Sequence, residues 1–134
     1  NHIDNGDVVV FHEDSKRDFI KRVIGTPGDT VEYKGDQLYV NNKKVSEPYL
    51  DYNKKHKQGQ YLTGSFKSSQ IKGSNGEMKL PKDKYLVLGD NRQNSIDSRF
   101  DVVGLVDKKQ LVGKVVWRYW PFNEWKTNFN PGTF

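Results

Sequence analysis

Lys21 is the side chain whose surroundings most favour acid–base chemistry. It lies in the run Phe19-Ile20-Lys21-Arg22-Val23, where Phe19 and Val23 share its face if side chains alternate along a strand. Burial among apolar neighbours disfavours an ammonium, so such an amine loses its proton more easily. For a base that works near neutral pH, the pKa must fall from about 10.4 by roughly three, at a cost of about 4 kcal/mol. The alternative is a lysine whose amine reaches water along a buried stem.

A dense polar segment, GDNRQNSIDSR at residues 89–99, directly follows the apolar run KYLVL at residues 84–88. Loops at the ends of rigid strands are where scaffolds usually present functional groups. This segment offers hydroxyl, carboxylate and guanidinium groups that could orient a base. The alternative is an ordinary polar turn, in which Asp90 and Asp97 accept hydrogen bonds from loop amides.

Other catalytic classes find less support. The chain has no cysteine, which excludes zinc ribbons, disulfide scaffolds and thiol catalysis. His2, His12 and His56 are scattered without a metal-ligand spacing, so neither a metal nor a cofactor is expected. The sequence lacks a Gly-x-Ser-x-Gly elbow. The run GTPGD at residues 25–29 lacks the lysine and hydroxyl of a phosphate loop, and it predicts a tight turn.

Strand patterns dominate the elements that must position these groups. Short β-branched or alternating runs, separated by turn formers, lie at residues 7–11, 18–24, 30–33, 37–40, 84–88 and 111–119. No stretch has a convincing helical period, although residues 107–110 could form one helical turn. The pattern predicts a mainly β fold, a small barrel or folded antiparallel sheet with short hairpins.

The 134 residues suit a single domain. Within it we expect the sheet core in residues 1–33 and 84–119, a hairpin plus a loop-rich insertion in residues 34–83, and an aromatic tail in residues 120–134. The insertion is expected because residues 46–84 are polar and weakly periodic.

The C-terminal region concentrates aromatic side chains beside basic ones. The group comprises Trp117, Tyr119, Trp120, Phe122 and Trp125. Such rings favour the headgroup level of a bilayer, although alternate rings could instead fill the core. The formal net charge of +5 permits contact with anionic lipid or nucleic acid without choosing between them. No apolar run is long enough to span a membrane.

Taken together, these segments resemble bacterial type I signal peptidases, especially the small forms of Gram-positive bacteria. The matching boxes appear in order: GDVVVF at residues 6–11, FIKRVIGTPGD at residues 19–29, GDNRQNSIDSR at residues 89–99, and the stretch from GLV at residues 104–106 through YWPF at residues 119–122. The resemblance implies barrel-like, folded antiparallel sheets with a loop-rich insertion. It also implies a serine endopeptidase with a serine–lysine dyad that removes signal peptides from exported preproteins.

The resemblance assigns roles to single residues. Lys21 falls on the general base, and Ser95 falls on the hydroxyl that orients its amine. The two supporting ion pairs fall on Arg22 with Asp90 and on Asp97 with Arg99. The shallow apolar pockets for small substrate residues fall on Val10, Phe19 and Ile20. Strict alternation would put Ile20 opposite Lys21, so either the strand twists or bulges, or an extended substrate is bound through the backbone edge.

The family's nucleophilic serine lies upstream of the position of Gly6, and none of the five residues before Gly6 is serine. We therefore expect a chain truncated before its serine and membrane anchor, inactive alone, whose parent works on the extracytoplasmic side of the cell membrane. The expected partners are signal peptides and the membrane surface. Three alternatives remain: a non-catalytic relative that binds peptides or assists surface assembly, a basic barrel for single-stranded nucleic acid, and a self-cleaving repressor-type peptidase. Nucleic acid is not the expected partner, because the lysine box would then be a coincidence.

Overall fold

The computed structural model describes residues 2–14 and 17–114. Within them lie the strands β1 (Val8–Asp14), β2 (Arg17–Gly25), β3 (Val31–Lys34), β4 (Gln37–Val40), β5 (Lys43–Val45), β6 (Phe66–Lys67), β7 (Lys84–Leu88), β8 (Val106–Asp107) and β9 (Leu111–Lys114). The helical elements are α1 (Asp51–Lys55) and the 3-10 turns η1 (Pro48–Leu50), η2 (Ser68–Gln70), η3 (Arg92–Asn94) and η4 (Lys108–Gln110). The prediction of a mainly β fold built from antiparallel sheets is confirmed.

The first sheet places β2 at its centre, in the order β8-β7-β2-β1-β9. Lys21 pairs with Val9 of β1, and Arg22 pairs with Leu88 of β7. The register with β7 shifts between Val23 and Gly25, so β2 has an irregularity at this point. Val23 and Ile24 point to opposite faces of β2, and both are fully buried because a different cluster covers each face.

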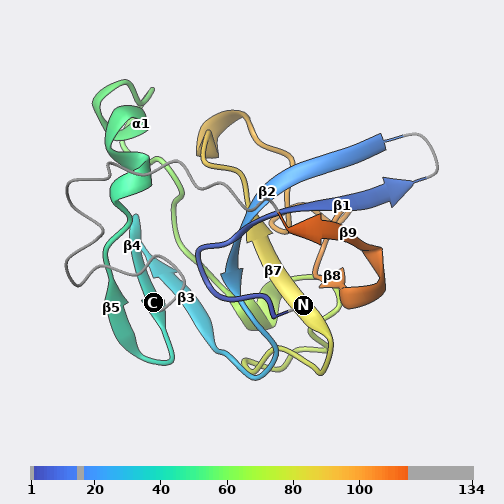
Figure 1. The fold of residues 1–134 in the computed structure, drawn as a ribbon. Helices are drawn as coiled ribbons and strands as arrows, with labels where there is room; N and C mark the ends of the chain where they lie inside the picture. The colour runs from blue at the N-terminus through green and yellow to red at the C-terminus, as the bar shows by residue number, and fades with distance from the viewer. Residues whose placement is uncertain (1, 15–16, 115–134) are drawn as a thin grey trace.

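The second sheet has the order β5-β4-β3-β6 and is built from tight hairpins. At the β4–β5 turn, Asn41 and Asn42 both adopt positive φ, a conformation that asparagine tolerates better than most residues. Figure 1 shows this sheet and α1 on one side of the molecule, while the β1–β2 hairpin projects on the other.

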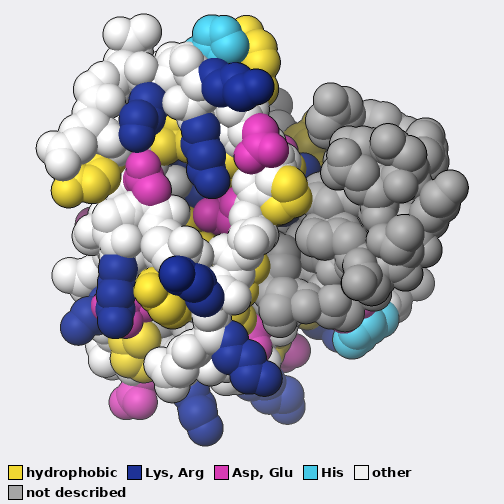
Figure 2. Space-filling view, turned by 90° about the vertical axis from the view of Figure 1, so that its left-hand side faces the viewer, with side chains coloured by type: hydrophobic (Ala, Val, Ile, Leu, Met, Phe, Trp, Pro, Cys, Tyr) yellow, Lys and Arg dark blue, Asp and Glu magenta, His cyan; other side chains and the backbone are white. Residues whose placement is uncertain are grey.

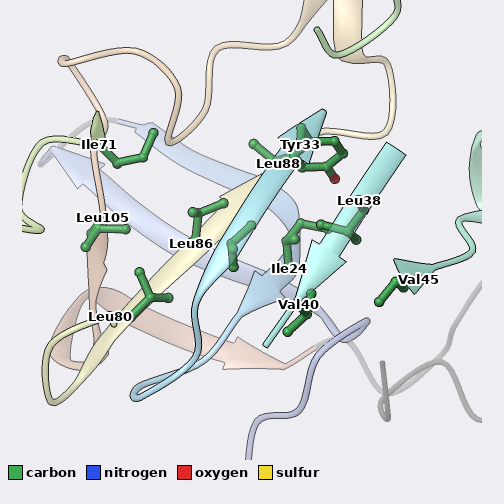
Figure 3. Packing of buried hydrophobic residues seen from close by; sticks show 11 residues of the cluster. Ile24, Tyr33, Leu38, Val40, Val45, Ile71, Leu80, Leu86, Leu88 and Leu105 are labelled. Atoms are coloured by element: carbon green, nitrogen blue, oxygen red, sulfur yellow. The ribbon is translucent and has the colours of Figure 1, made fainter. Parts of the chain in front are cut away.

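The main core lies between the two sheets. Ile24 and Leu86 of the first sheet lie against Leu38 and Val40 of the second, as Figure 3 shows. Fully burying one such side chain contributes about 1.5–3 kcal/mol. A smaller cluster that includes Val9, Phe11 and Val87 packs separately. Because strands of the first sheet contribute to both clusters, β2 and β7 form a rigid base for the segments that leave their ends.

The segment between β5 and β7 is irregular, but it is fastened to the second sheet. Asp36, in the β3–β4 turn, accepts backbone hydrogen bonds from Leu62 (2.9 Å), Thr63 (2.8 Å) and Gly64 (2.9 Å). Burial opposes ionisation of Asp36, yet these three amides hold its pKa below the ordinary value. Leu62 is itself buried with Tyr49 and Leu50. The segment is therefore held in place by both polar and apolar contacts.

The face shown in Figure 2 carries side chains of both charges. In Figure 2, lysine and arginine side chains are spread over the face in view, among acidic and uncharged ones. None of the helices within residues 2–14 and 17–114 is long and apolar enough to cross a membrane. The aromatic group from Trp117 to Trp125 lies outside the described residues, so its interfacial role stays a prediction.

Candidate active site

Lys21 lies in the middle of β2 with its amine against the loop that follows β7. Its Nζ donates a hydrogen bond of 2.9 Å to Ser95 Oγ and lies 5.5 Å from the ring centroid of Phe19. The pKa of Lys21 is below its ordinary value. Burial is the largest cause, and the Arg99 charge adds to it, while Asp97 and Asp90 act in the opposite direction. The amine is therefore easier to deprotonate than that of a solvated lysine.

Ser95 reaches Lys21 because its side chain packs directly against the backbone of Gly89. A Cβ built on Gly89 would lie 2.1 Å from Ser95 Oγ, 2.6 Å from Ser95 Cβ and 3.2 Å from Lys21 Nζ. Only glycine leaves room for this contact. The sequence pattern alone indicated no role for Gly89, although a glycine in or beside a strand often marks such a close approach.

The first ion pair fixes the start of the loop. Arg22 holds Asp90 through two hydrogen bonds, Nε to Oδ1 at 3.0 Å and Nη2 to Oδ2 at 2.8 Å. Its Nη1 also donates to the carbonyl of Gly6 at 2.9 Å, and its guanidinium lies 4.1 Å from the ring centroid of Tyr49. Arg22 is only 2% exposed, and a two-point bond of this kind fixes orientation as well as position.

The second ion pair fixes the end of the loop. Arg99 donates from Nε and Nη2 to the two carboxylate oxygens of Asp97, each at 2.8 Å. Asp97 is fully buried and also accepts the amide of Gly89 at 3.0 Å. Burial would raise the pKa of Asp97, but hydrogen bonding and charge from Arg99, with smaller contributions from Gly89 and Ser95, hold it below the ordinary value. The segment therefore combines amide capping, as in the ordinary-turn interpretation, with both ion pairs that the resemblance implied.

The three residues expected to line substrate pockets do not share one face. Val10 and Ile20 are cross-strand partners, next to the pair Val9 and Lys21, and the register is continuous there. Strict alternation therefore holds at Ile20, which points away from the face of Lys21 and is 62% exposed. Phe19 lies on the Lys21 side and is half-buried, as is Val10.

Arg92 is a second residue that sequence analysis missed. It lies in η3, three residues before Ser95, and its guanidinium is fully buried and paired with Glu47. No local pattern links two positions 45 residues apart. Among the described residues there is also no cluster of histidine, cysteine or acidic side chains that could hold a metal ion.

Comparisons with known proteins agree with this arrangement. The family model described as "Signal peptidase, peptidase S26" matches residues 1–120. Signal peptidase IB of Staphylococcus aureus (strain Mu50) is 58% identical over 130 residues, which cover 96% of this chain and 67% of that protein. Signal peptidase I S of Bacillus subtilis (strain 168) is 49% identical over 129 residues, which cover 93% of this chain and 64% of that protein. The crystal structure of a signal peptidase I from Enterococcus faecalis V583 superposes with a TM-score of 0.76 at 32% identity, covering 87% of this chain and 98% of that one.

Proposed function

The chain belongs to the signal peptidase family, peptidase S26, whose members are serine endopeptidases that remove signal peptides, and on this premise we propose that Lys21 is its general base. The observation that carries the assignment is the half-buried amine of Lys21 at 2.9 Å from Ser95 Oγ. Burial lowers the pKa of Lys21, which raises the fraction of neutral amine able to accept a proton.

The neutral amine has one lone pair and two hydrogens. One hydrogen is donated to Ser95 Oγ, which leaves the lone pair free to face a nucleophilic hydroxyl. In the proposed reaction, Lys21 takes the proton of that hydroxyl as its oxygen attacks the carbonyl carbon of the scissile peptide. The proton then passes to the leaving amine, and an acyl-enzyme ester remains. Lys21 next takes a proton from water as the water oxygen attacks the ester carbon. It then passes that proton to the serine oxygen as the ester bond breaks, which restores the serine hydroxyl and the neutral amine.

We place the nucleophilic serine in a segment that precedes Gly6 in the full protein. The two serines of the 89–99 loop, Ser95 and Ser98, are buried, and their hydroxyls accept hydrogen bonds from other groups. Ser95 is 8% exposed and accepts from Lys21, while Ser98 is 1% exposed and its Oγ accepts the amide of Val87 at 2.9 Å. These contacts support orienting and structural roles respectively.

The proposed substrates are signal peptides of exported preproteins. Their small residues bind along the β1–β2 hairpin, where Phe19 lies on the Lys21 face and Val10 and Ile20 lie on the opposite face. The exposure of Ile20 and the half-burial of the other two support an open, shallow surface, and the opposite faces of Ile20 and Lys21 favour recognition of the substrate backbone along the hairpin. We place the enzyme at the extracytoplasmic side of the cell membrane.

Replacing Ser95 by alanine tests the orienting role. In a form of the protein that carries the serine segment before Asn1, kcat should fall while KM stays within about twofold. Loss of one orienting hydrogen bond costs about 1–3 kcal/mol, which corresponds to roughly a 5- to 150-fold loss in kcat. The measurement is steady-state cleavage of a signal-peptide substrate.

Ser98→Ala is the matched control, because Ser98 is a buried serine of the same loop whose hydroxyl bonds a backbone amide instead of Lys21. It should lower the melting temperature without a comparable loss in kcat. An unchanged kcat in Ser95→Ala would refute the orienting role. Covalent labelling of Ser95 by a serine-directed acylating inhibitor would show that Ser95 is itself the nucleophile.

A further inference from the structure

Arg92 is a buried charged side chain that the proposed reaction does not use. Its Nη1 donates to Tyr33 Oη and to Thr63 Oγ1, both at 3.0 Å, and its Nη2 donates to Glu47 Oε2 at 3.0 Å. These three partners come from β3 and from the segment between β5 and β7. The guanidinium therefore fastens the 89–99 loop to a part of the chain far from Lys21 in sequence.

Glu47 is the centre of this buried network. Its Oε2 accepts hydrogen bonds from Tyr33 and Tyr49, each at 2.8 Å, as well as from Arg92. Burial raises the pKa of both tyrosines, and the Glu47 charge adds to this effect while the Arg92 charge opposes it, so both remain hydroxyl donors. Burial alone would lower the pKa of Arg92, but the nearby Glu47 carboxylate holds it above the ordinary value, so the guanidinium stays charged.

Two further bonds connect Arg92 to the residues around Lys21. Its Nε donates to the carbonyl of Gly89 at 2.8 Å, and its own carbonyl accepts Arg99 Nη2 at 2.8 Å. Gly89 is the residue on which Ser95 Oγ rests, and Arg99 holds Asp97. A displacement of Arg92 would therefore move both Gly89, against which Ser95 packs, and the ion pair between Arg99 and Asp97.

A buried ion pair is weak evidence for stability, because desolvation of the two charges offsets much of their attraction. The geometry of the Arg92–Glu47 pair instead favours a role in positioning the 89–99 loop. Arginine bonds Gly89, Thr63, Tyr33 and Glu47 at the same time with a planar fork, which a flexible ammonium cannot reproduce.

We propose that Arg92 and Glu47 form a buried clamp through which the segment between β5 and β7 positions Ser95 and Lys21. Arg92 is thus a positioning residue and does not touch the reacting atoms. The proposal rests on the function proposed above, since it concerns the orientation of the same base.

Three substitutions test the clamp in the protein that carries the serine segment. Arg92→Lys keeps the charge but loses the fork, Glu47→Gln keeps the shape but loses the charge, and Thr63→Val removes a single hydrogen bond at little risk to folding. We expect Arg92→Lys and Glu47→Gln to lower kcat roughly tenfold to a hundredfold with KM within about twofold, and Thr63→Val to lower kcat less. The double variant that combines Arg92→Lys and Glu47→Gln should lose less kcat than the product of the two single fold-losses, because both substitutions break the same clamp.

Val40→Ala is the control for a merely structural effect. Val40 is 3% exposed in the core between the sheets, and the substitution destabilises the same part of the fold without touching the clamp. All rates are measured well below each variant's melting temperature. Unchanged kcat in the folded clamp variants, or an equal loss of kcat in Val40→Ala, would overturn the proposal. Lys21→Met in the same assay separates the two claims: if it stays active, the base assignment fails, and if it is inactive while the clamp variants keep full kcat, only the clamp fails.

Discussion

Replacing Lys21 by methionine should lower kcat by at least about a thousandfold in the protein that carries the serine segment. Methionine matches the length of the buried stem but cannot accept a proton. The described site offers no substitute base at this position, because Ser95 is the acceptor of the Lys21 hydrogen bond and Asp97 is held ionised and paired with Arg99. The measurement is single-turnover cleavage of a signal-peptide substrate, which reports the chemical step itself.

The same substitution should leave the fold at least as stable near neutral pH. Because burial lowers the pKa of Lys21 in the folded state, the unfolded chain binds the proton more tightly than the folded one. The resulting loss of folding stability is complete at pH values below the pKa of Lys21 in the folded protein. It disappears as the pH rises toward the ordinary lysine pKa. The melting temperature of Lys21→Met should therefore exceed that of the parent protein at neutral pH, and the difference should shrink at alkaline pH. Collapse of Lys21→Met at neutral pH would mean that its inactivity reflects unfolding.

Gly89→Ala should produce the second large loss, on the order of a hundredfold in kcat. The added methyl would lie 2.1 Å from Ser95 Oγ and 3.2 Å from Lys21 Nζ, so the two side chains must separate. Gly89 also donates its amide to Asp97 and its carbonyl accepts from Arg92, so the backbone cannot easily move away. The measurement is kcat, together with the free energy of unfolding from urea denaturation.

A second-site change separates the steric cause from other effects of Gly89→Ala. Adding Ser95→Gly removes the side chain that the new methyl meets, so the double variant should recover stability but not kcat. Gly28→Ala is a control in an open turn, where nothing lies within 4 Å, and it should affect stability alone because Gly28 has a φ of 89°. Full activity in Gly89→Ala would show that the close contact of Ser95 is not needed.

The sequence predicted the strands around the site but not how they are connected in space. The apolar run around Val23 and Ile24 indicated a strand, yet the two clusters that bury its opposite faces are built from residues distant in sequence. Lys21 alone was ambiguous, because a lone strand lysine usually reaches solvent. Its hydrogen bond to Ser95 joins positions 74 residues apart, and the family resemblance indicated that pairing where periodicity could not.

The residues that sequence analysis missed share one physical property: their roles depend on contacts made in three dimensions. Arg92 looked like one of several polar residues in a loop, because its partner Glu47 lies in a weakly periodic segment. Gly89 looked like a turn former, because the Ser95 side chain that excludes a Cβ is brought there by the fold. Helix α1 was also missed, since five residues are too few to show a helical period.

The central claim, that Lys21 is a poised base, is tested most directly by titrating its amine. Nitrogen-15 NMR of the lysine side chains, with the Lys21 signal assigned by its absence in Lys21→Met, follows the Nζ resonance through the pH range. The account predicts a midpoint for Lys21 clearly below the ordinary lysine value of about 10.4. A Lys21 midpoint at or above that value would contradict it, because the amine would then be protonated where the enzyme needs a base.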